Sequence, residues 1–97
     1  MIIGAARVSL FLPNSHSLKE KRCILKSLIH RTENQFNASV AEVENQDLWQ
    51  SAVIGVACVA DDHRHADEMI AHVLHFIESS ALEFKVTQIE TEVVYTL

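Results

Sequence analysis

The stretch SAVIGVACVADDHRHADEMIAHVLHFI, residues 51–77, decides the fold. Its first ten residues are apolar almost without interruption, which is typical of a strand covered on both faces in the middle of a sheet. Asp61 and Asp62 then offer an N-cap for a helix. Apolar residues follow at the spacing of a helix with one buried face: they are Ala66, Met69, Ile70, Val73, Leu74 and Ile77. These residues predict a central strand followed by an amphipathic helix.

The residues on either side of this stretch predict three more strands and a second helix. Residues 2–12 alternate in polarity, as a half-buried strand does. Pro13 ends that strand, and Ser17 with Glu20 forms a capping box that begins a helix reaching about Gln35. Residues 37–44 predict another strand, and residues 84–97 alternate as the last one.

The predicted order is β-α-β-β-α-β in a single domain, residues 1–97. Right-handed crossovers place both helices on one face of a four-stranded antiparallel sheet, with the strands 2–12 and 51–60 in its centre. The fold class is therefore α+β, ferredoxin-like, with one sheet face open. On that face we expect an apolar strip, made of Phe11, Val53, Ala57 and Val59, which a twofold homodimer would bury.

Composition and termini exclude several classes of protein. Two Gly and one Pro leave no room for a flexible linker. The chain enters its first strand without a basic segment, and no apolar run could span a bilayer, so we expect neither a signal peptide nor contact with a membrane. Cys23 and Cys58 lie outside any metal or redox spacing, which indicates free thiols and a cytoplasmic protein.

The charge is distributed unevenly. The net charge is −5, yet residues 1–36 hold six Lys and Arg against two Glu. On a helical wheel Lys19, Arg22 and Lys26 lie opposite the apolar face, and Arg31 belongs to the same helix. The stripe is either a solvated helix back or a ridge for phosphates or an acidic partner. It contains no aromatic residue that could stack on a base.

Lys21 and the connection at residues 46–50 stand out for other reasons. Lys21 falls in the middle of the apolar arc, so its side chain either snorkels past the core edge or meets an anion or ligand. Trp49 either covers one end of the core or, ringed by Gln46 and Asp47, forms a recognition surface. The candidate partner-binding residues are Lys19, Lys21, Arg22, Lys26, Arg31, Gln46, Asp47 and Trp49.

The remaining clusters give little support for catalysis or for a cofactor. His72 and His75 share the polar face of the second helix with His65 and Glu68, and we expect only weak zinc or nickel binding there. The sequence has no nucleophile elbow and no Gly-rich phosphate loop. Arg7 balances the carboxylates of Glu90 and Glu92 across neighbouring strands. We therefore expect no catalytic residues, no metal and no cofactor.

Several strings of the sequence resemble a known family. They are Leu12-Pro13, Ser17-Leu-Lys-Glu-Lys-Arg22, Phe36-Asn37, Ser39-Val-Ala-Glu-Val43 and Gln46-Asp47-x-Trp49-Gln50. They are similar to the YlxP-like family of small bacterial proteins of uncharacterised function, and the resemblance covers essentially the whole chain. The resemblance implies a ferredoxin-like fold and a link to translation or ribosome maturation, because such genes tend to lie among genes of that machinery. Cys23 departs from the family pattern, where a further basic residue is usual, and so do the histidines of the second helix.

Two functional hypotheses follow from these observations. The first is a non-enzymatic accessory factor that docks on the ribosome, on structured RNA or on a ribonucleoprotein through the helix 17–35 and the connection 46–50. The alternative is a self-associating module that binds a protein partner, with the basic helix merely solvated.

Overall fold

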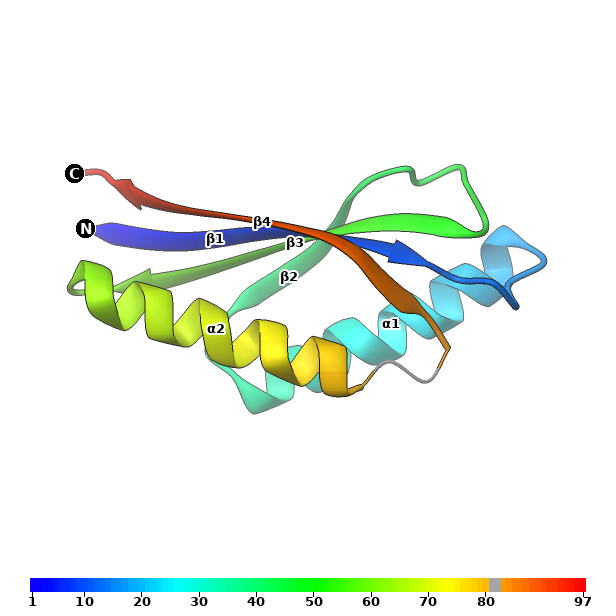
Figure 1. Ribbon diagram of the computed structural model, residues 1–97, viewed down its shortest axis with the longest axis horizontal. Helices are drawn as coiled ribbons and strands as arrows, with labels where there is room; N and C mark the ends of the chain where they lie inside the picture. Colours follow the sequence, from blue (N-terminus) through cyan, green and yellow to red (C-terminus); the bar gives the residue numbers. More distant parts are fainter. Residues whose placement is uncertain (81–82) are drawn as a thin grey trace.

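The structure is a computed structural model that describes residues 1–80 and 83–97. Its elements are β1 (Ile2–Phe11), α1 (Leu18–Gln35), β2 (Ser39–Glu44), β3 (Ser51–Ala60), α2 (His63–Ser79) and β4 (Lys85–Tyr95). The strands form one antiparallel sheet in the order β2-β3-β1-β4. Figure 1 shows both helices on the same side of this sheet, so the predicted ferredoxin-like fold is confirmed.

Both helices begin where the predicted caps place them. The Ser17 hydroxyl accepts the Glu20 N–H at 3.1 Å, and the Glu20 carboxylate reaches back to accept the His16 N–H at 2.7 Å. Asp62 caps α2 by accepting the His65 N–H at 2.7 Å. These side chains satisfy backbone donors that have no partner inside the helix. No helix in the described part of the chain is both long and apolar enough to cross a membrane.

The core lies between the sheet and the two helices. Val8 of β1, Ile54 of β3 and Ile77 of α2 are completely buried in it. Gly4 lets α2 approach β1, because a Cβ at this position would lie 2.9 Å from Ile70 Cγ1. Both cysteines are free thiols, as predicted. Burial also raises the pKa of the Cys58 thiol, which is enclosed between the sheet and the helices.

The open face of the sheet presents only part of the predicted apolar strip. Phe11 and Val59 are 43% and 59% exposed, but Val53 is only 5% exposed, so its prediction as a solvent-facing residue is wrong. The register gives the reason. Val53 lies between Ser9 of β1 and Glu44 of β2, whereas Val59 lies beyond the first residue of β2 and has a neighbour on one side only.

Candidate partner-binding surface

The exposed side of α1 carries three basic residues without ion-pair partners. The buried residues of this helix are Lys21, Leu25, Leu28 and Thr32, so Lys19, Arg22 and Lys26 face away from the sheet and are exposed. In the described part of the chain no carboxylate lies within 4 Å of these three cations, while Arg7 has two and Lys21 and Arg64 have one each. We call Lys19, Arg22 and Lys26 the basic ridge.

Lys21 lies in the core and does not snorkel to the surface, so that interpretation is wrong. The side chain is completely buried. Its ammonium donates to the carbonyl oxygens of Asn45 at 2.8 Å, Gln46 at 3.2 Å and Ser51 at 3.3 Å. The ammonium also meets an anion, because Glu42 Oε2 lies 2.8 Å from Nζ.

The contact with Glu42 is an ion pair rather than a well-aligned hydrogen bond. Glu42 Oε2 is itself buried and accepts no hydrogen bond of good geometry, although its distance to the ammonium is short. The three protons of the ammonium are directed at the three carbonyl oxygens, which leaves Coulombic attraction as the link to the carboxylate. Lys21 therefore joins α1 to the base of the β2–β3 connection, and its ammonium is not available to a partner.

The β2–β3 connection is fixed at both ends and exposed in the middle. Asn45 adopts φ 63°, a left-handed conformation that Asn tolerates better than most residues, and its carbonyl also accepts the Leu48 N–H at 3.0 Å. At the other end, the Leu12 N–H donates to the Gln50 carbonyl at 2.9 Å. Trp49 and Leu48 are each 49% exposed and lie outside the core, so Trp49 does not cover the core's end.

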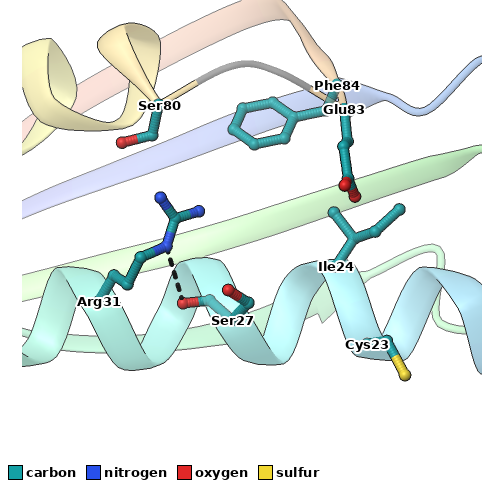
Figure 2. A pocket seen from close by; sticks show the side chains of 7 residues that line it. All are labelled: Cys23, Ile24, Ser27, Arg31, Ser80, Glu83 and Phe84. Atoms are coloured by element: carbon teal, nitrogen blue, oxygen red, sulfur yellow. Dashed lines mark hydrogen bonds between the residues drawn. The ribbon is translucent and has the colours of Figure 1, made fainter.

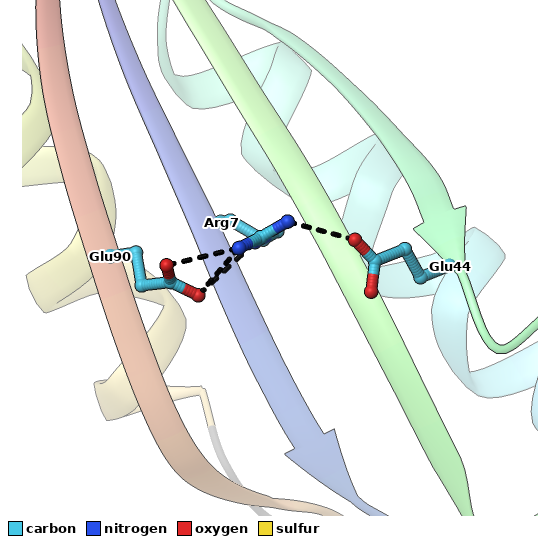
Figure 3. A network of polar contacts seen from close by, with 3 residues as sticks. All are labelled: Arg7, Glu44 and Glu90. Carbon is cyan, nitrogen blue, oxygen red and sulfur yellow. Dashed lines mark hydrogen bonds and ion pairs between the residues drawn. The ribbon is translucent and has the colours of Figure 1, made fainter.

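A network of ion pairs crosses the open face of the sheet (Figure 3). The Arg7 guanidinium makes a bidentate contact with Glu90 of β4 and reaches over β3 to Glu44 of β2, at 2.8 Å. Gly55 lies directly opposite Arg7 on β3, and the Val43 side chain packs over it, because a Cβ at this position would lie 2.8 Å from Val43 Cγ1. The predicted pair with Glu90 is confirmed. Glu92 makes no such contact, and the sequence reading missed Glu44.

The charges of this network reinforce one another. Hydrogen bonds and Coulombic attraction from Glu90, and then from Glu44, raise the pKa of Arg7. All three side chains are about half exposed, so the network adds little to stability, as is usual for surface pairs. Its main effect is to hold the middle of the open face in a fixed polar arrangement.

Arg31 is separated from the basic ridge. It lies on the flank of α1, beside a hollow of about 310 Å³ whose other side is lined by Ser80, Glu83 and Phe84. Figure 2 shows its guanidinium pointing toward Ser80, while its Nε donates to the Ser27 carbonyl at 3.4 Å. Arg31 therefore faces α2 rather than the side of α1 on which the ridge lies.

Two of the four histidines of α2 lie beside carboxylates. His63 lies 3.1 Å from Asp67, and His65 lies 3.3 Å from Asp61. The hydrogen bond from His65 is the main cause that lowers the pKa of Asp61. Across residues 1–80 and 83–97, no three His, Cys, Asp or Glu side chains are grouped so that they could hold a metal ion. Weak binding of zinc or nickel by His72 and His75 stays a prediction.

Comparison with known proteins identifies the family. Residues 3–91 match the family described as "Protein of unknown function (DUF503)". The chain is also 37% identical, over 78 residues, to "Uncharacterized protein YlxP" of Bacillus subtilis (strain 168), an alignment that covers 80% of this chain and 85% of that protein. The chain belongs to the DUF503 family. The resemblance read from the sequence is thereby confirmed.

The structural matches of this DUF503 protein concern the fold alone. One is a de novo designed protein with a ferredoxin fold, LFR1 1, with a TM-score of 0.57 and 18% identity, covering 100% of this chain and 88% of the other. Another is the de novo designed protein Foldit4, with a TM-score of 0.54 and 10% identity over 100% of both chains. The candidate partner-binding surface is therefore argued only from the contacts within this chain. These contacts join the ridge-bearing helix to the connection at residues 45–50 and set Arg31 apart.

Proposed function

We propose that this DUF503 protein is a non-enzymatic accessory factor of translation or ribosome maturation that docks on RNA or ribonucleoprotein. The observation that carries the proposal is the basic ridge. Thirteen Asp and Glu residues accompany eight Lys and Arg in the chain, yet Lys19, Arg22 and Lys26 have no carboxylate within ion-pair distance in the described part of it. Cations left unpaired in an acidic protein are suited to an external polyanion.

The spacing of the ridge fits a phosphate backbone. Lys19 and Lys26 are two helical turns apart, which corresponds to about 10 Å along the axis, with Arg22 between them. Contacts of this kind release counterions and give affinity with little sequence preference. The ridge lacks an aromatic residue, so it is suited to the backbone of folded RNA rather than to splayed bases.

The β2–β3 connection supplies a second contact at the same end of the molecule. Figure 1 shows this connection and the first turn of α1 at one end of the sheet. Lys21 fixes them relative to each other through the carbonyl oxygens of Asn45, Gln46 and Ser51. Trp49 and Leu48 are apolar and exposed, and Gln46 and Asp47 are polar neighbours, so this contact suits the protein part of a ribonucleoprotein.

The salt dependence of binding tests the proposal. The double variant Arg22→Gln/Lys26→Gln removes two ridge charges, and the matched control Arg64→Gln/Lys85→Gln removes two charges from α2 and β4. We expect the ridge variant to bind purified ribosomal subunits more weakly and to lower the slope of log K against log salt by about 1.5 to 2 units. The control should retain the slope. If wild-type protein shows no affinity for ribosomal subunits or structured RNA at low salt, the proposal is wrong.

A second candidate function is self-association through the open sheet face. The observation that favours it is the exposure of Phe11 and Val59 there, together with Val43 at 46% and Val94 at 37%. In this case the partner is another copy or another protein, and the basic ridge is only solvated.

A further inference from the structure

The two edges of the sheet differ in how well they are protected against further strands. β2 has only six residues, and its register with β3 shifts between Glu42 and Glu44. In addition, the Val40 N–H is bonded to the Glu33 carboxylate of α1 at 3.1 Å. A short strand, an irregular register and a capping side chain are all means by which proteins prevent an edge from pairing. The β2 edge is therefore blocked.

The β4 edge has fewer protections, because its register with β1 shifts only near one end of the strand, between Val86 and Gln88. β4 runs for eleven residues, contains no proline and forms the outer strand of the sheet, as Figure 3 shows. All its residues except Val86 and Val93 are exposed. In the part of the chain that the structure describes, no side chain bonds to the backbone of β4. From Gln88 to Tyr95 the register with β1 is regular, so this part of the edge is a straight template.

The direction of each backbone group on β4 follows from its pairing with β1. Thr96 and Met1 exchange two bonds, at 2.9 Å and 2.7 Å. Successive residues of a strand point their N–H groups to alternate sides. Glu90, Glu92 and Val94 therefore donate toward β1. The residues that present both N–H and C=O at the free edge are Ile89, Thr91, Val93 and Tyr95.

The charge beside this edge determines which kind of strand can pair with β4. Glu90 and Glu92 project from β4 on the open face; Glu90 is paired with Arg7, but Glu92 has no cation within 4 Å in the described part of the chain. A second copy paired about a twofold axis at Thr91 would set Glu90 opposite Glu92 twice, and like charges in that position are destabilising. A strand with Lys or Arg at alternate positions would set cations there.

We propose that β4 binds an extended basic segment of another protein as a fifth, antiparallel strand. The Lys or Arg side chains of that segment lie over Glu90 and Glu92, and the residues between them exchange backbone hydrogen bonds with Ile89, Thr91 and Val93. This site is separate from the basic ridge, so binding of a basic strand to β4 does not depend on RNA docking and is tested separately.

The probe is a fluorescein-labelled peptide of about eleven residues in which Lys alternates with Val or Thr, a length that matches β4. Its anisotropy measures binding to the whole chain. A second peptide is N-methylated at its Val and Thr residues, whose amides face β4, and an isomeric control is N-methylated at its Lys residues. We expect the first methylated peptide to bind at least tenfold more weakly than the unmodified peptide, and the control to retain its affinity. Equal binding of both methylated peptides would show simple charge attraction and overturn the proposal.

Variants of the protein test the same contact from the other side. Thr91→Pro removes one outward N–H without removing a bond to β1, and proline is tolerated on an edge strand. We expect it to weaken binding at least tenfold, Thr91→Val to leave binding unchanged, and Glu92→Gln to weaken it a few-fold; circular dichroism confirms folding. If wild-type protein fails to bind the unmodified peptide, or forms a dimer that Thr91→Pro dissociates, the proposed occupant is wrong.

Discussion

At the scale of single residues, the Lys21 ammonium is held by three carbonyl oxygens and one carboxylate. An ammonium that has left water needs acceptors for all three of its protons and a negative charge nearby. The carbonyl oxygens of Asn45, Gln46 and Ser51 are the three acceptors, and the Glu42 carboxylate is the negative charge. The helical wheel could predict that Lys21 points inward, because that follows from its position alone. It could not predict these acceptors, because they belong to a connection whose path depends on the tertiary fold.

The first prediction concerns the replacement Lys21→Met. Methionine fills the space but leaves the Glu42 carboxylate and three carbonyl oxygens without their partner. Breaking a buried pair from one side costs about 3 to 5 kcal/mol, and we expect the lower figure because the Glu42 side chain retains 18% exposure. Urea denaturation measures the loss. The double variant Lys21→Met/Glu42→Leu should recover part of the stability, since it removes the unpaired charge. A Lys21→Met protein as stable as wild type would contradict the buried pair.

At the scale of elements, the sequence predicted the strands and helices well because their signals are local. The capping box at Ser17, the N-cap at Asp62 and the periodicity of α2 each lie within a short stretch of sequence. Arg7 shows the limit of this reasoning. Its pairing with Glu90 followed from neighbouring strands, but Glu44 lies two strands away, and its contact depends on the sheet order. The predicted exposure of Val53 was wrong for the same reason, because the burial of this side chain depends on where β2 ends.

The second prediction concerns Trp49 in the β2–β3 connection. Because Trp49 is half exposed and lies outside the core, Trp49→Ala should cost less than about 1 kcal/mol, whereas a core tryptophan costs about 3 to 5 kcal/mol. The same variant should weaken binding of ribosomal particles if the connection is the second contact. Denaturation followed by circular dichroism gives the stability, and cosedimentation gives the binding. Full binding by a stable Trp49→Ala protein would limit the docking surface to α1.

At the scale of the whole molecule, charge separates the two sides of the sheet. The basic ridge lies on α1, on the helical side, whereas the open face carries Arg7 between Glu44 and Glu90, with Glu92 beside them. The net charge of −5 and the order of the charged residues along the chain reveal only part of this separation. The excess of basic residues before position 37 could be read from the sequence, but the acidic centre of the open face required three strands to be placed side by side.

The last prediction uses this separation to distinguish self-association from RNA docking. Four strands of six to eleven residues give a face of about 600 Å², so two copies bury about 1,200 Å² in total, at the lower limit of stable interfaces. Any twofold packing centred on this face brings together two ion-pair networks, each with two Glu and one Arg and therefore a net negative charge. The two networks repel each other, and salt reduces this repulsion. We therefore expect a weak dimer that salt strengthens, whereas salt weakens binding to RNA.

Multi-angle light scattering at low and high salt, over a range of protein concentrations, measures this dimer. Val59→Glu places a charge at the most exposed large apolar residue of β3 and should keep the protein monomeric. The control Ala71→Glu adds the same charge on the exposed side of α2 and should leave the dimer intact, because no part of the open face is altered. A dimer that dissociates as salt rises would point to an interface held by charge attraction, such as the ridge against the acidic face. A wild-type monomer at all salt and protein concentrations would exclude self-association through the sheet.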